Sequence, residues 1–116
     1  MKYLCLIYDQ ESTLQAMSEA EGSAFMGEYG TFTQELIGAG KMLGGEELSP
    51  VSTATTIRIR NGVLTTTDGP FAETKEQLGG FYLIDATDLN DAIRIASRIP
   101  SARIGSIEVR PINMRS

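Results

Sequence analysis

The chain has 116 residues, of which 41% are hydrophobic and 22% charged, and its formal net charge is −5. This length predicts a single domain over residues 1–116 that buries a core without disulfides or metals. The chain has no histidine and a single cysteine, Cys5. Ser-His-Asp and Cys-His catalysis, zinc sites built from Cys and His, and an intrachain disulfide are therefore excluded.

The charge is distributed unevenly. Residues 1–50 carry eight acidic and two basic side chains, a net of −6, whereas residues 51–116 carry seven and eight, a net of +1. There is no basic stripe for nucleic acid, no apolar run near the roughly 20 residues of a membrane span, and no Asp-x-Asp metal loop. No signal peptide is visible. We expect a cytoplasmic protein with no nucleic-acid or membrane partner and no cofactor.

The first part of the chain predicts a strand, a helix and a second strand. Residues 2–8 alternate as a strand with two apolar faces, one made of Tyr3, Cys5 and Ile7 and the other of Leu4, Leu6 and Tyr8. Residues 11–39 predict a helix broken near Gly22 and closed by Gly40 in a left-handed conformation. The helix stripe is Phe25, Tyr29, Phe32 and Leu36. Residues 42–48 predict a weaker strand.

The second part predicts a hairpin, a strand, a helix and a last strand. Residues 53–60 and 63–67 flank Asn61-Gly62, the strongest hairpin signal in the chain. Residues 80–85 form a strand that is apolar on both faces. Thr87 or Asp88 caps the second helix and Pro100 stops it, with an expected buried stripe of Leu89, Ala92, Ile93 and Ala96. Residues 106–112 predict the final strand.

This order of elements predicts an α+β fold, a ferredoxin-like βαββαβ sandwich with an added hairpin and both helices on one face of an antiparallel sheet. The second sheet face then needs another cover, and a partner subunit is the economical choice in so short a chain. We expect Arg58, Glu108 and Arg110 on that face. Such a mixed face suits an intersubunit cavity, and it equally suits a partly wet dimer interface without a ligand.

The stretch Asp68-Gly69-Pro70-Phe71, continued by Ala72-Glu73-Thr74-Lys75-Glu76 and Gly79-Gly80-Phe81, resembles the DGPF-domain proteins of the YCII-related family. The first strand and three later segments are also similar, namely Ala86-Thr87-Asp88-Leu89, Arg98-Ile99-Pro100 and Glu108-Val109-Arg110-Pro111. The resemblance implies the dimeric α/β-barrel type of fold and a homodimer whose sheets face each other.

The same resemblance implies little about activity, because function in this family is largely uncharacterised. Its genes often lie beside those of extracytoplasmic-function sigma factors, which implies a link to sigma-factor systems. A His–Asp pair has been proposed as the active site of the wider group. This chain has no histidine, so the pair is incomplete, and Asp68 is the acid that matches the motif.

The candidate site residues are centred on this loop. Asp68 is either a turn residue or a carboxylate at the mouth of a cavity, acting as base or ligand anchor. Glu73 is the second candidate catalytic acid, unless the loop is merely charged. Phe71 either contacts a ligand or anchors the loop to the core. Lys75 suits a small carboxylate or phosphate.

Further candidates come from the strands. Arg58 and Arg110 suit the same anion, or pair with Glu108 across strands. Tyr82, like Tyr8, offers a hydroxyl to a cavity or finds a partner in the core. Our first hypothesis is a dimeric protein that binds a small anionic ligand or regulates a sigma-factor system. The alternative is a histidine-free enzyme using Asp68 or Glu73 as general acid or base, and a third is a protein-interaction module.

Overall fold

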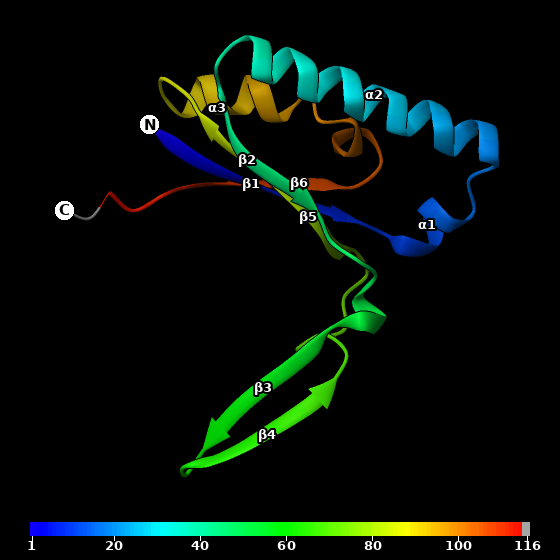
Figure 1. The fold of residues 1–116 in the computed structure, drawn as a ribbon, viewed down its shortest axis with the longest axis vertical. Helices are drawn as coiled ribbons and strands as arrows, with labels where there is room; N and C mark the ends of the chain where they lie inside the picture. The colour runs from blue at the N-terminus through cyan, green and yellow to red at the C-terminus, as the bar shows by residue number, and fades with distance from the viewer. Residues whose placement is uncertain (115–116) are drawn as a thin grey trace.

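The computed structural model describes residues 1–114. A four-stranded antiparallel sheet, in the order β2-β5-β1-β6, carries the helices on one face, and a separate hairpin of β3 and β4 stands off from it (Figure 1). The strands are β1 (Lys2–Asp9), β2 (Met42–Glu47), β3 (Thr55–Arg60), β4 (Val63–Asp68), β5 (Gln77–Asp85) and β6 (Ser106–Pro111). The helices are α1 (Glu11–Gln15), α2 (Glu19–Gly38) and α3 (Leu89–Ala96), and 3₁₀ turns span Val51–Thr53 and Pro100–Arg103. The predicted ferredoxin-like α+β fold with an added hairpin is confirmed.

The core lies between the sheet and the helices. Alternation along β1 turns Tyr3, Cys5 and Ile7 inward, as predicted, where they meet Tyr82 and Ile84 of β5 and two residues of α2, Phe32 and Leu36. The rings of Phe32 and Tyr82 pack edge to face, with centroids 5.2 Å apart. Cys5 is fully buried, and burial raises its pKa to about 11, so it acts as a small core residue.

The other face of the sheet, which we call the open face, has no helix over it (Figure 1). Its side chains are Leu4, Leu6, Tyr8, Phe81, Leu83, Glu108 and Arg110. Glu108 and Arg110 form an ion pair within β6, and the Tyr8 hydroxyl donates to Glu108 at 3.5 Å. The expectation that Arg58 shares this face is wrong. Its strand pairs with β4 alone, outside the main sheet.

The first helical region breaks earlier than expected. We predicted a break near Gly22, but α1 ends at Gln15 and α2 begins after Ser18. The Ser18 hydroxyl accepts from the Glu21 N–H, while the Glu21 carboxylate accepts from the Ser18 N–H, so a capping box starts the new helix. No helix within residues 1–114 is long and apolar enough to span a membrane.

The buried stripe of α3 is also rotated from the predicted one. Leu89 and Ile93 are about half exposed, and Asp91 and Ile95 are buried instead. Asp91 turns inward because its carboxylate accepts from the Thr87 N–H at 2.9 Å and pairs with Lys41 at 3.2 Å. These contacts of the carboxylate determine which residues of the short helix face the core.

Candidate functional site

A half-open groove of about 730 Å³ runs between α1 and α2 on one side and β2 and β5 on the other. The apolar part of its wall is contributed by the side chains Leu14, Met17, Phe25, Met26 and Met42. Phe25 and Tyr29 of α2 both line the groove, and their rings pack edge to face with centroids 5.4 Å apart. The volume is that of a small-molecule site.

A chain of three hydrogen-bonded side chains lies at the buried end of this groove. The Ser101 hydroxyl donates to Asp9 Oδ2 at 2.8 Å, and the Tyr29 hydroxyl lies 2.5 Å from Ser101 Oγ. Asp9 is 7% exposed and Ser101 is fully buried, while Asp9 and Tyr29 both line the groove. Among residues 1–114, no group pairs with the second carboxylate oxygen, Asp9 Oδ1. We call this set the Asp9 network.

The environment of Asp9 favours a protonated carboxyl. Burial raises its pKa above the usual value, the bond from Ser101 lowers it in part, and the negative charge of Glu76 raises it further. Burial also raises the pKa of Tyr29 to about 12, so its hydroxyl keeps its proton at neutral pH. An enclosed carboxyl with a raised pKa, bonded to the Ser101 hydroxyl beside a groove, is an arrangement typical of functional sites.

Two glycines allow the backbone to close around this end of the groove. A Cβ on Gly105 would lie 2.1 Å from the Tyr8 carbonyl oxygen and 2.7 Å from Asp9 Oδ1. A Cβ on Gly80 would lie 2.9 Å from the Glu46 carbonyl oxygen of the neighbouring strand. Gly105 therefore lets the 3₁₀ turn Pro100–Arg103 hold Ser101 against Asp9, and Gly80 lets β2 and β5 pair closely along the groove floor.

The groove is acidic. Asp9, Glu11 and Glu47 line it, and none of its described lining residues is a lysine or arginine. Glu11 is held at the rim, where its carboxylate accepts from the Val51 N–H at 3.0 Å. Within residues 1–114 no three carboxylates or thiols approach closely enough to share a metal ion. The groove thus suits an organic group that is cationic or donates hydrogen bonds.

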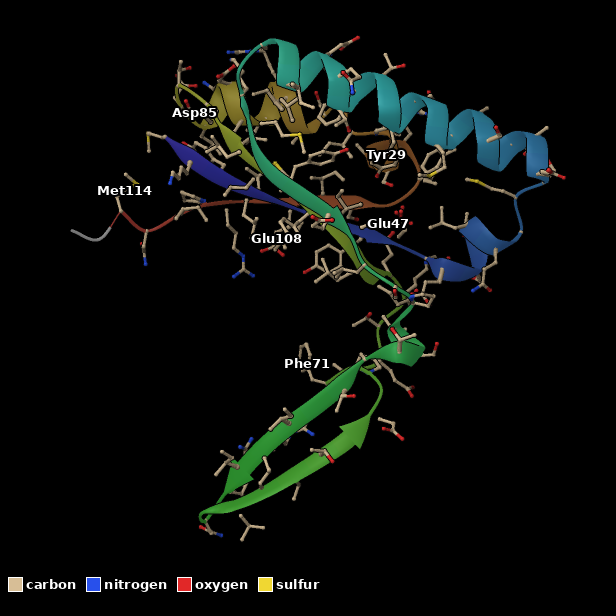
Figure 2. The ribbon with its side chains drawn as sticks, viewed as in Figure 1. Tyr29, Glu47, Phe71, Asp85, Glu108 and Met114 are labelled. Atoms are coloured by element: carbon tan, nitrogen blue, oxygen red, sulfur yellow. The ribbon has the colours of Figure 1, made fainter. Side chains whose placement is uncertain are left out.

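Residues 68–75, the loop that begins with the DGPF stretch, do not line this groove and lie at the root of the β3–β4 hairpin, where Figure 2 labels Phe71. The end of the loop is tied to the groove by Gln77, a lining residue whose side-chain amide donates to the Thr74 and Lys75 carbonyl oxygens. Asp68 ends β4 opposite Thr55, and Gly69 takes the predicted positive φ, at 99°. Glu73 and Lys75 are exposed. Phe71 is 80% exposed, so the reading in which it anchors the loop to the core is wrong.

The predicted site residues therefore fall in three places. Asp68, Phe71, Glu73 and Lys75 share the loop with Arg58, whose guanidinium donates to the Phe71 carbonyl oxygen at 3.4 Å. Arg110 lies on the open face, paired with Glu108 along one strand rather than across two. Tyr82 lines the groove, where its hydroxyl bonds to Thr33 at 2.7 Å. Of the predicted residues, Tyr82 alone lines the groove that Asp9 and Tyr29 also line.

Sequence reasoning missed Asp9, Tyr29 and Ser101 as functional residues. The signal for Asp9 was present, because the alternation that buries Tyr3, Cys5 and Ile7 continues to residue 9, and we ended the strand at residue 8. Tyr29 was identified only as part of the helix stripe. Nothing in the local sequence marks Ser101, which depends on a contact across 92 positions.

Comparisons with known proteins agree with these observations. The model of the YCII-related domain matches residues 1–114. An uncharacterised protein of Rhizobium meliloti (strain 1021) is 40% identical over 114 residues, which is 97% of this chain and 92% of that protein. Both matches span the groove, the DGPF loop and the hairpin together.

Proposed function

This chain belongs to the YCII-related family, and we propose that it binds a small organic molecule in the groove between α2 and the sheet. The observation that carries the proposal is the enclosed Asp9 carboxyl, unpaired at Oδ1, at the end of a groove lined by apolar and acidic residues. A buried polar atom without a partner costs free energy that burial elsewhere must offset. Such a group in a native structure requires an explanation, and service to a bound molecule or to a reaction is one.

The ligand we infer has an apolar body and a cationic or hydrogen-bond-donating head. Phe25 and Met26 offer a surface for the body, and the head would lie toward Asp9 and Tyr29. A cationic head would favour ionised Asp9, so binding would lower the pKa of that carboxyl. This differs from the anionic ligand expected from the sequence, which depended on Lys75, Arg58 and Arg110, none of which lines the groove.

A thermal-shift screen tests the proposal. Aliphatic and aromatic amines are compared with carboxylates and phosphates on wild type, Asp9→Asn and, as a matched control, Asp68→Asn. A ligand at 100 times its Kd adds about 2.7 kcal/mol, on the order of 10 °C for this size. We expect amines to stabilise wild type and Asp68→Asn but not Asp9→Asn. Stabilisation only by anions, lost in Asp68→Asn, would place the site at the DGPF loop and overturn the proposal.

A second candidate is an enzyme that transfers a proton, with Asp9 in place of the predicted Asp68 or Glu73. The raised pKa of Asp9 and its connection through Ser101 to the Tyr29 hydroxyl favour it. Turnover of an identified ligand, abolished by Asp9→Asn with binding retained, would separate this function from binding alone. The link to sigma-factor systems stays a prediction of the family resemblance.

A further inference from the structure

The groove carries two carboxylates at its rim, apart from the buried Asp9. Glu47 is exposed on β2 and lines the groove, and Glu11 lines it where the chain leaves β1. The Glu11 carboxylate is held in place by the Val51 N–H, from which it accepts at 3.0 Å. Within residues 1–114, neither Glu11 nor Glu47 forms an ion pair with a base. The rim therefore carries negative charge that this part of the chain does not neutralise.

The strand register sets the separation of Glu47 from Asp9. Glu47 pairs with Gly80 of β5, and Gly80 pairs in turn with Ile7 of β1. Asp9 follows Ile7 by two residues, so both turn toward the helices. Two strand spacings across the sheet and two residues along it separate the Cα atoms of Glu47 and Asp9 by roughly 12 Å. At that separation one ammonium group contacts only one of the two carboxylates, but one extended ligand can reach both.

The floor of the groove is made by two adjacent glycines where it passes between these carboxylates. Gly79 and Gly80 of β5 both line the groove, and Gly80 lies directly between Glu47 and Ile7 in the register. Phe25 and Met26 of α2 line it from the helix side. Because glycine has no side chain, an aliphatic chain can lie directly on the β5 backbone along this line. The groove is thus shaped for a narrow, extended body.

The far end of such a ligand would lie beside Glu47. With one ammonium group at Asp9 and the body along the floor, a methyl group at the other end would displace water from the Glu47 carboxylate without replacing its hydrogen bonds. A second ammonium group would replace them with a charge-assisted bond of about 2.8 Å. None of the described lining residues is a lysine or arginine that would repel it.

We propose that the groove binds an aliphatic diamine or a short polyamine, with one ammonium group at Asp9 and a second at Glu47. This inference rests on the proposed binding function and names the class of ligand. The separation set by the strands requires about four to eight methylene groups between the two nitrogens. Glu11, at the same rim, adds to the negative potential that attracts the second charge.

Isothermal titration calorimetry with matched amines tests the proposal. Hexane-1,6-diamine and hexylamine, which differ only in the second amine, are titrated into wild type, Glu47→Gln and Glu46→Gln. Glu46→Gln is the control, because it removes the same charge one residue away, at a position whose register partner, Phe81, lies on the open face. We expect wild type to bind the diamine roughly fivefold more tightly than the monoamine. Glu47→Gln should abolish this preference without weakening hexylamine, and Glu46→Gln should retain it.

The length of the diamine distinguishes a ligand that bridges two carboxylates from general attraction of a dication to an acidic groove. Propane-1,3-diamine is too short to span Asp9 and Glu47, so it should bind no more tightly than propylamine. A diamine preference that is independent of length, or that persists in Glu47→Gln, would overturn the inference. Equal binding of hexylamine and hexane-1,6-diamine to wild type would overturn it and leave the proposed amine site standing. Binding of no amine would overturn both.

Discussion

The hydroxyl of Ser101 donates to Asp9 Oδ2 at 2.8 Å, across 92 positions of the chain. This bond ties the 3₁₀ turn before β6 to the end of β1, and it leaves the other oxygen of the carboxylate enclosed without a partner. The local fold thus places a carboxyl, a hydroxyl and a phenol at the end of one groove. The first predictions concern this arrangement.

Asp9 should give the protein a distinctive pH dependence. Because the pKa of Asp9 is raised in the folded state, its contribution is fully present below its ordinary pKa of 3.8 and is lost as pH rises through the raised value. Asp9→Asn removes this contribution, so the difference in Tm, wild type minus variant, should fall as pH rises from 4 to 7. Glu76→Gln removes a neighbouring negative charge and should weaken the same trend. A difference that is flat across this range would contradict the assignment.

Gly105 should be intolerant of a side chain. The alanine methyl of Gly105→Ala would lie 2.1 Å from the Tyr8 carbonyl oxygen, so the backbone must shift. The free energy of unfolding should therefore drop by about 2–3 kcal/mol. Gly79→Ala is the control, since nothing lies within 4 Å of its added methyl, and it should stay within about 0.5 kcal/mol of wild type. Urea denaturation measures both. Equal effects would mean that the approach at Gly105 is not tight.

Substitutions at two glycines of α2 distinguish the effect of filling the groove from the effect of stabilising the helix. A leucine at Gly22→Leu enters the groove that Gly22 lines, whereas Gly27→Leu lies on the opposite side of the helix. Neither position has an atom within 4 Å of an added Cβ, so both variants should gain up to about 1 kcal/mol from helix propensity. Only Gly22→Leu should abolish the ligand-induced thermal shift. A ligand-induced shift that persists in Gly22→Leu would indicate a site outside the groove.

Asp91 should stabilise the fold at neutral pH and lose that contribution in acid. The Thr87 N–H and the Lys41 ammonium stabilise its carboxylate and lower its pKa from 3.8 to about 2. A lowered pKa contributes stability above the unfolded value, and that stability is lost as pH falls from about 4 to about 2. Asp91→Asn should therefore lower the Tm at pH 7 and flatten the decline between pH 4 and 2. Glu73→Gln, in the exposed loop, serves as the control and should follow wild type.

Much of the fold was predictable because local signals agreed with the tertiary structure. Alternation in β1 found the core face, Asn61-Gly62 set the turn with φ of 52° and 75°, and Gly40 closed the helix at φ 71°. The predictions failed where a single tertiary or capping contact decided the outcome. The capping box at Ser18 moved the helix break, and the carboxylate of Asp91 rotated α3.

The candidate site was less predictable for the same reason. The DGPF stretch predicted a functional site because its polar and charged residues are adjacent in sequence. In the structure, Asp68 and Lys75 are both exposed. The Asp9 network joins three elements through side chains that are unremarkable where they stand. Burial turns an ordinary strand-end aspartate into a perturbed carboxyl, and burial is a property of the assembled fold.

Amide chemical-shift mapping with an amine that stabilises the protein tests the central claim most directly. Titration into isotope-labelled wild type should move amides around Asp9, Tyr29, Thr33, Tyr82 and Ser101, and the same titration into Asp9→Asn should move few or none. Shifts confined to residues 68–75, or shifts in the groove that persist unchanged in Asp9→Asn, would contradict a binding site built on the Asp9 network.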